Sequence, residues 1–274
     1  MMKKLGITTR YAILIVVAFA SVFPLLVAAD TVFKSDADVA GVQHWIPTSV
    51  TWKYLHETLF GAQVWHWMRS SLIIAAGVAI CTLILGILAA YALARRQFRG
   101  SRTYLDLVLV TQTVAPAVLI VPLFRLFGRA GLLNSYLGVI IVSTAFVLPF
   151  AIWLLVAFFR QVPFEIEEAA ALDGAAGFRF LLRFVIPISL PGITATGVWA
   201  FIYGWNEFMF SLTFLSGASN KWPITIGVSS SVGQYAVSWQ PLMVTSIIGS
   251  VPILVLFLMF RRQLEAGLGT AAVG

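Results

Sequence analysis

The sequence has little charge, a single cysteine and only three histidines among its 274 residues. Charged residues make up 11% of the chain and hydrophobic residues 60%, which excludes an ordinary soluble domain, where about a quarter of the residues are charged. The single Cys81 excludes a disulfide within the chain. The phosphate-binding motif G-x-x-x-x-G-K-[ST] is also missing, so a nucleotide site of this common type is excluded. This composition is typical of a membrane protein with several spans.

The chain carries a net charge of +7, which in other proteins can indicate nucleic-acid binding. Here the basic residues stand in small groups beside apolar segments, as anchors at a membrane surface do. We therefore predict the lipid bilayer as a partner, and no nucleic acid.

Six apolar stretches are long enough to cross a bilayer, which takes about 20 residues. The first is longer than the apolar core of a typical signal peptide, so we expect it to be retained as a helix. With no internal repeat or linker in sight, we predict one all-α integral membrane domain over residues 1–274, its helices kinked at Pro116, Pro122 and Pro149. The six predicted transmembrane helices comprise residues 11–29, 71–94, 105–127, 136–159, 193–215 and 242–260.

An even number of spans places both termini on the same side, and the basic residues indicate which side. Twelve of them lie at the termini and in the second and fourth connecting loops, against six on the other side. Because Lys and Arg favour the cytoplasmic side, we predict that both termini and the loop 160–192 are cytoplasmic. The cytoplasmic set is Lys3, Lys4, Arg10, Arg95, Arg96, Arg99, Arg102, Arg160, Arg179, Arg183, Arg261 and Arg262, and the external set is Lys34, Lys53, Arg69, Arg125, Arg129 and Lys221.

The first external loop, about residues 30–70, contains all three histidines, His44, His56 and His66. They are 12 and 10 residues apart, with no thiol or carboxylate at ligand spacing, so solvated or interfacial histidines are favoured over a metal site. The same loop has four tryptophans that fit an aromatic belt at the lipid headgroups: Trp45, Trp52, Trp65 and Trp67.

The loop 160–192 reads "RQVPFEIEEAAALDGAAGFRFLLRFVIPISLPG" and mixes charged and small residues. Pro163 suits the first turn of a helix, the glutamates that follow suit its positive end, and Gly174 suits a left-handed residue at its other end. A second short helix is expected up to Val185, with a stripe formed by Phe178, Leu181, Leu182 and Val185, and with Pro187 and Pro191 ending it.

This helix-turn-helix has a smooth alanine face beside acidic residues, and two interpretations follow from the residues alone. Small side chains allow another protein surface to approach closely, which favours a docking element. An interfacial helix that only caps the bundle is the alternative.

Several motifs resemble the permease subunits of bacterial binding-protein-dependent ABC importers. "EAAALDG" (168–174) followed by "IPISLP" (186–191) is similar to the EAA loop of that family, and the Asp before the Gly resembles its carbohydrate branch, the maltose-type and glycerol-phosphate-type permeases. The length suits the shorter permease of such a pair. Ser70-Ser71 departs from the Asn-Ser common in relatives. Further similar motifs are "FKS" (33–35), "PTSVTWKYL" (47–55), "AAYALARRQFRG" (89–100), "LIVPLFRLFGRAGLLNSYLGVII" (119–141) and "WNEF" (205–208).

The resemblance implies a type I ABC importer permease in the bacterial inner membrane, whose EAA loop is a cytoplasmic coupling helix. It implies a second permease, two ATP-binding subunits that hold ATP and Mg²⁺, an external sugar-binding protein and a carbohydrate substrate, with no cofactor on this chain. Motion of the ATPase subunits would tilt the attached spans. The positions that carry over as coupling residues are Glu168, Ala169, Ala170, Asp173 and Gly174.

Polar groups at bilayer depth are costly and so mark candidate sites. The fifth span carries Tyr203, Trp205, Asn206 and Glu207, and the third carries Gln112. Amides, carboxylates and aromatic rings suit a sugar, so these residues are candidates for a substrate pathway. The alternative is that they bond neighbouring helices for assembly.

Two other function classes are alternatives to transport driven by ATP. "GVSSS" (227–231) faintly resembles a serine nucleophile turn, but all the histidines lie in one external loop, so no catalytic residue is predicted. A secondary transporter or channel is the alternative to an importer subunit, although such proteins often carry ionisable residues in several spans, whereas Glu207 stands nearly alone.

Overall fold

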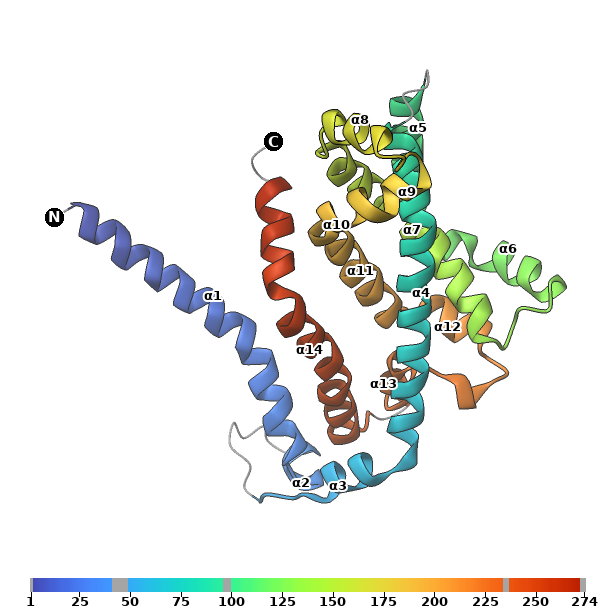
Figure 1. Ribbon diagram of the computed structural model, residues 1–274. Helices are drawn as coiled ribbons and strands as arrows, with labels where there is room; N and C mark the ends of the chain where they lie inside the picture. The colour runs from blue at the N-terminus through green and yellow to red at the C-terminus, as the bar shows by residue number, and fades with distance from the viewer. Residues whose placement is uncertain (1, 41–48, 96–99, 234–236, 272–274) are drawn as a thin grey trace. The chain divides into compact units, whose positions relative to one another are not determined.

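The computed structural model describes residues 2–40, 49–95, 100–233 and 237–271, which form helices and no strand. His44, Trp45, Arg96 and Arg99 lie outside these described residues. The longer helices are α1 (Met2–Val32), α4 (Ala62–Arg95), α5 (Ser101–Val110), α6 (Pro116–Arg129), α7 (Tyr136–Arg160), α11 (Leu190–Trp205) and α14 (Trp239–Ala271) (Figure 1). The shorter ones are α2 (Asp36–Ala40), α3 (Lys53–Phe60), η1 (Thr111–Thr113), α8 (Phe164–Leu172), α9 (Phe178–Phe180), η2 (Leu181–Val185), α10 (Ile186–Ile188), α12 (Met209–Phe214), η3 (Ser219–Lys221) and α13 (Ile224–Ser230).

Within the described residues, four helices are long and apolar enough to cross a membrane, and two bent pairs could each form one more span. The four contain the first, second, fourth and sixth predicted spans: Thr9–Val32, Ala62–Arg95, Tyr136–Arg160 and Trp239–Arg261. The bent pairs are Thr103–Thr113 with Pro116–Arg129, at 92°, and Phe178–Ile188 with Leu190–Trp205, at 82°.

The third predicted span, 105–127, is therefore not one straight helix. Pro116 has no N–H to donate and biases the residue before it toward an extended backbone, and Ala115 has φ −62° and ψ 127°. The chain turns there and restarts as α6 with Pro116 in its first turn. The other two prolines predicted to kink helices, Pro122 and Pro149, lie inside continuous helices.

The chain forms two compact units, of which the first comprises Met1–Trp65 and Gly227–Val251. In this unit Asp36 joins two segments far apart in the sequence, because its carboxylate accepts hydrogen bonds from the Tyr54 hydroxyl (2.6 Å) and the Gln240 amide (3.1 Å). Phe33 also packs edge-on against Trp52, with ring centroids 4.9 Å apart. The segment after α1 is thus fastened to α3 and to the start of α14.

The second unit, His66–Ile226 and Pro252–Gly274, holds the main apolar core and the residues of the candidate sites. Helices α7 and α11 pack along each other. Helix α11 also approaches α4 closely at Gly204, where a Cβ would lie 2.9 Å from the Cα of Ala75. Only a glycine permits that approach, as is usual where membrane helices pack tightly.

Candidate functional site

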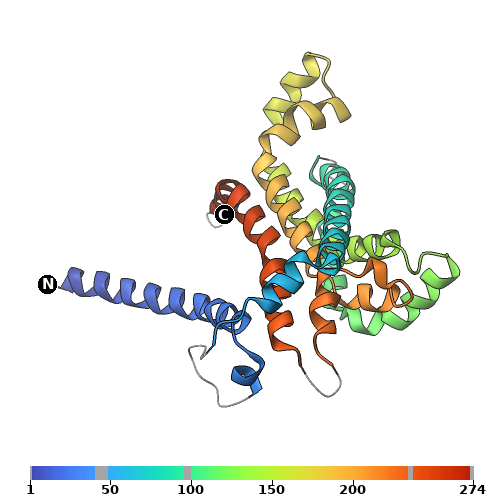
Figure 2. The ribbon, with the colours of Figure 1, turned by 90° about the horizontal axis from the view of Figure 1, so that it is seen from below.

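Helix α8 is the acidic, alanine-rich element singled out in the sequence, and it begins and ends for local reasons. Pro163 precedes it with an extended backbone, and Glu165 and Glu167 occupy the first turn, where the positive end of the helix dipole stabilises them. In Figure 1 and Figure 2, α8 lies beyond one end of α11, joined to it through α9 and α10.

The end of α8 is closed by Gly174, which has a left-handed backbone with φ +73°. Its N–H donates to the Ala171 carbonyl (3.1 Å), and the Ala175 N–H donates to the Ala170 carbonyl (2.8 Å). This pair of hydrogen bonds is the Schellman arrangement, which satisfies carbonyls at the end of a helix. The left-handed glycine expected from the sequence is thus present at Gly174.

The two faces of α8 differ in exposure. Ala170 is only 2% exposed and, with the partly buried Ile166 one turn earlier, packs into the apolar core. Leu172, by contrast, is 91% exposed, which is the highest value among the exposed large hydrophobic side chains of the described residues. Glu168 and Ala169 are exposed as well, and Phe164 at the start of the helix is 51% exposed. The exposed side of α8 is therefore acidic, with Leu172 as its most exposed apolar side chain.

This arrangement changes the set of contact positions expected from the sequence. Glu168, Ala169, Asp173 and Gly174 are accessible, but Ala170 faces the protein interior. Leu172 was not among the contact positions predicted from the sequence. The spacing of Ile166 and Ala170 at i, i+4 is the signal that marks the inner face of this helix and leaves Leu172 outside it.

The second half of the loop differs from the predicted helix in its register. Phe178 and Leu182 are exposed to 61% and 50%, whereas Phe180, Leu181 and Val185 are buried. The cause is the wide π turn η2, in which the Ile186 N–H donates to the Leu181 carbonyl five residues back. A helix with more residues per turn places a different set of side chains on one face.

The prediction that Pro187 ends this helix is wrong, because Pro187 lies inside α10. A proline clashes with the carbonyl four residues before it in a regular α-helix, and a wide turn just ahead of the proline relieves that clash. The helix ends instead at Ser189, one residue before α11 begins.

The fifth predicted span, 193–215, breaks at the conspicuous polar pair Asn206 and Glu207. Helix α11 ends at Trp205, and the Asn206 amide donates to the Ile202 carbonyl (2.9 Å) at its last turn. The buried Glu207 carboxylate accepts from the N–H groups of Phe210 and Ser211, at 2.8 Å each, and from the Ser211 hydroxyl. Glu207 therefore starts the new helix α12 by capping its free N–H groups.

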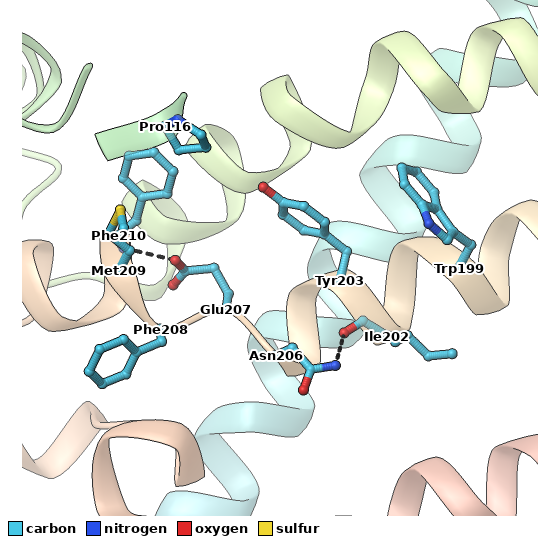
Figure 3. Close-up of a pocket in the computed structure, with 9 residues that line it drawn as sticks. All are labelled: Pro116, Trp199, Ile202, Tyr203, Asn206, Glu207, Phe208, Met209 and Phe210. Carbon is cyan, nitrogen blue, oxygen red and sulfur yellow. Dashed lines mark hydrogen bonds between the residues drawn. The ribbon is translucent and has the colours of Figure 1, made fainter. Parts of the chain in front are cut away.

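A cavity of about 510 Å³ lies beside this break, between the end of α11 and the start of α12. Figure 3 shows the Tyr203 ring extending from α11 toward the side on which Pro116 and Glu207 lie, with Trp199 one turn earlier on the same helix. The residues that line it are Pro116, Trp199, Ile202, Tyr203, Asn206, Glu207, Phe208, Met209 and Phe210.

The structure brings together three of the five predicted pathway residues, namely Tyr203, Asn206 and Glu207. Trp205 is 2% exposed, stacks on Phe201 and does not line the cavity. Gln112 lines a separate cavity of about 450 Å³, where its amide donates to the Phe146 carbonyl (2.9 Å). No described group of three or more His, Cys, Asp or Glu side chains could hold a metal ion.

The aromatic members of the cavity other than Tyr203 were not identified from the sequence. Trp199 precedes Tyr203 by four residues, and this helical spacing is the signal that could have found it. Phe208 and Phe210 follow the break in the helix, and no sequence periodicity extends across that break. The result is a site with aromatic rings, an amide and a carboxylate, which can stack against and hydrogen-bond a polar organic molecule.

Comparisons with known proteins agree with these features. Residues 82–269 match the family described as "binding-protein-dependent transport system inner membrane component". The trehalose transport system permease protein SugB of Mycobacterium tuberculosis is 32% identical over 209 residues, covering 74% of this chain and 76% of that protein. The sulfoquinovosyl glycerol transport system permease protein SmoH of Agrobacterium fabrum is 28% identical over 247 residues, covering 90% and 86%.

The fold is similar to that of a bacterial ABC transporter involved in the import of the acidic polysaccharide alginate. The TM-score is 0.80 at 19% sequence identity, over 96% of this chain and 97% of the other. The predicted fold class, an all-α membrane protein of the type I ABC importer permease kind, is confirmed. This chain belongs to the family of inner membrane components of binding-protein-dependent transport systems.

Proposed function

We propose that this chain is the permease subunit of an ATP-driven carbohydrate importer, and that α8 is its docking helix for an ATP-binding subunit. The observation that carries this proposal is the difference between the two faces of α8, because Ala170 is buried and Leu172 is exposed. The polar residues of α8 are acidic, whereas a helix that lies on a lipid surface is typically rich in Lys and Arg on its polar face. A protein contact is therefore favoured over a membrane cap. A strongly exposed apolar side chain beside polar residues is typical of a protein contact.

The docking face consists of Glu168, Ala169, Leu172 and Asp173. The partner ATP-binding subunits would carry ATP and Mg²⁺, in accord with the absence of the phosphate-binding motif from this sequence. A second permease and an external sugar-binding protein complete the proposed importer. Closure of the ATP-binding subunits would move α8 as a rigid element and tilt the helices joined to it.

The basic residues support an orientation with α8 and both termini in the cytoplasm. Relatives whose names specify trehalose and sulfoquinovosyl glycerol support a carbohydrate as the substrate. We place the substrate pathway at the cavity beside α11, with Tyr203 and Trp199 offering rings and Asn206 offering an amide. Glu207 contributes mainly by holding the start of α12, since its carboxylate already accepts three hydrogen bonds.

Cysteine cross-linking tests the docking role directly. In a Cys81→Ala background, Leu172→Cys should cross-link to the ATP-binding subunit in the complete importer, whereas Ala170→Cys, two residues away, should not. The pair shares one helix and differs in the face it presents, so each variant controls for the other. Equal capture by both positions, or capture by neither, would contradict the proposed docking face.

Transport measurements test coupling and pathway separately. Glu168→Lys and Gly174→Asp should leave the protein in the membrane but uncouple ATP hydrolysis from uptake, whereas Glu168→Gln should have the smaller effect. Asn206→Ala should impair uptake and spare assembly of the complex. Loss of assembly would instead favour a structural role for Asn206.

A further inference from the structure

Helix α4 donates two side-chain hydrogen bonds to the segments on either side of α8, although it is distant from them in the sequence. The Tyr91 hydroxyl donates to the Gly177 carbonyl (3.1 Å), and the Arg95 guanidinium donates through Nη2 to the Val162 carbonyl (2.9 Å). Tyr91 and Arg95 are four residues apart in α4, so they lie on one face of its last turns.

The two carbonyls stand on opposite flanks of α8. Val162 precedes the helix, and Gly177 follows the turn that ends it. The two hydrogen bonds from α4 therefore hold the docking element at its entry and at its exit.

Arg95 makes additional contacts that fix its position. Its side chain is 4% exposed, its Nη1 lies 3.5 Å from a carboxylate oxygen of Glu167, and its guanidinium lies over the rings of Phe164 (5.0 Å) and Phe180 (5.7 Å). A planar guanidinium can donate to a carbonyl, pair with a carboxylate and lie over aromatic rings at once, which an ammonium group cannot do. These contacts involve the inner side of α8 and leave Glu168 and Leu172 free for a partner.

The covalent connection from α8 to α11 is poorly suited to transmitting a force. It contains two glycines with positive φ, Gly174 (+73°) and Gly177 (+59°), and around each of them a Cβ would meet nothing within 4 Å. Glycine has no side chain to restrict the backbone, so these positions can act as pivots. A docking helix connected only in this way could rotate without moving the bundle.

From this geometry we propose that Tyr91 and Arg95 are positioning residues that make α4 a force-transmitting helix. Movement of α8 is then transmitted to α4 through the hydrogen bonds to the Val162 and Gly177 carbonyls, which we call the clamp. It is also transmitted to α7 and α11 along the chain. The inference rests on the proposed docking role of α8 and adds a second route by which docking drives the membrane helices.

The test uses the complete importer in liposomes and measures sugar uptake and ATP hydrolysis in the same preparation. Tyr91→Phe removes one hydroxyl and keeps the ring. Arg95→Gln removes the positive charge and the N–H donors of the guanidinium. Tyr91→Phe should lower the uptake per ATP hydrolysed by roughly threefold to tenfold, the effect of one lost neutral hydrogen bond, and Arg95→Gln by roughly tenfold or more, the effect of a lost hydrogen bond from a charged group. Arg95→Lys should restore part of the ratio, because an ammonium can replace only some of the contacts.

Matched controls are Tyr104→Phe and Arg261→Gln, exposed residues of α5 and α14 whose side chains make no hydrogen bond within the described part of the chain. Both should keep the parental ratio of uptake to hydrolysis. A parental ratio in Tyr91→Phe and Arg95→Gln would overturn the inference. If Arg95→Gln fails to assemble, Tyr91→Phe decides the question, because it leaves the core packing of the ring unchanged.

A docking variant separates this inference from the proposed function. Leu172→Asp should reduce association of the ATP-binding subunit, while Tyr91→Phe should leave that association at the parental level and change only the uptake per ATP. Normal association and uptake in Leu172→Asp would refute the docking proposal itself. If association is impaired in Leu172→Asp but the uptake per ATP stays at the parental level in Tyr91→Phe and Arg95→Gln, only the role of α4 is refuted.

Discussion

Replacing Leu172 by alanine separates docking from folding, because the side chain contacts almost nothing within its own chain. The residue is 91% exposed, so Leu172→Ala removes little buried area from the folded protein. Burying a leucine side chain fully stabilises a complex by about 1.5–3 kcal/mol. Loss of that burial should weaken binding of the ATP-binding subunit by roughly tenfold to a hundredfold, since 1.4 kcal/mol corresponds to a factor of about ten.

The assay compares binding with thermal stability in the same variants. The permease is placed in lipid nanodiscs with its partner permease, and the ATP-binding subunit is titrated against it to obtain a dissociation constant. Thermal unfolding of the permease is followed in parallel. Leu172→Ala should raise the dissociation constant and leave the unfolding temperature unchanged.

The opposite substitution on the inner face provides the control. Ala170 is 2% exposed and packed in the core, so Ala170→Leu should overpack it at a cost of about 1–3 kcal/mol and lower the unfolding temperature. Two results would refute the reasoning about the two faces of α8. One is an unchanged dissociation constant for Leu172→Ala, and the other is an unfolding temperature that falls in Leu172→Ala as far as in Ala170→Leu.

Further predictions concern the end of α8, the break after α11 and the contact between Tyr54 and Asp36. Gly174→Ala should destabilise the end of α8 by about 1–2 kcal/mol through its left-handed backbone alone, since the added Cβ meets no atom within 4 Å; hydrogen exchange at Ala175 should rise, and less so for Gly174→Asn. Glu207→Ala should lower the unfolding temperature, because a lost N-terminal cap costs about 0.5–2 kcal/mol, whereas Tyr203→Phe should reduce uptake at an unchanged unfolding temperature. The hydrogen bond from Tyr54 to Asp36 is the largest cause that raises the pKa of Tyr54. The contribution of this hydrogen bond to stability is therefore complete below the unfolded-state pKa of about 10 and is lost as the pH rises through the folded-state pKa. Asp36→Asn should lower the pKa of Tyr54 in an NMR titration of ring-labelled tyrosine.

Features of the chain that depend on local rules could be predicted from the sequence. The helix start after Pro163 and the left-handed Gly174 follow from residue types that suit one backbone conformation. The long apolar runs likewise predicted the four uninterrupted spanning helices, because a run of that length in lipid must satisfy its own backbone hydrogen bonds.

Features that depend on packing or on competition between hydrogen bonds could not be predicted in this way. The burial of Ala170 rather than Ala169 depends on where α8 meets the core. Three successive alanines do not decide it by themselves, and only the i, i+4 spacing to Ile166 indicates Ala170. Glu207 could be recognised as a costly polar group in an apolar run, but its role as the cap of α12 depends on the break after Trp205. The π turn before Pro187 changes which side chains of this helix share a face. Phe178 and Leu182 are therefore exposed, although ideal helical spacing had placed them on the buried side.

The strength of the inner contacts of α8 can be compared with that of its outer face. The proposed docking contact of Leu172 would contribute about 1.5–3 kcal/mol. If α8 were held to its own subunit by much less than that, it would be pulled away from the subunit and would not transmit movement. The neutral bond from Tyr91 contributes about 0.5–1.5 kcal/mol and the charged bond from Arg95 about 1.5–3 kcal/mol, and Arg95 also lies over two rings. The contacts of Tyr91 and Arg95 together are therefore about as strong as the proposed docking contact of Leu172. Under this condition, a pull on Leu172 moves α4 before it separates α8 from its own subunit.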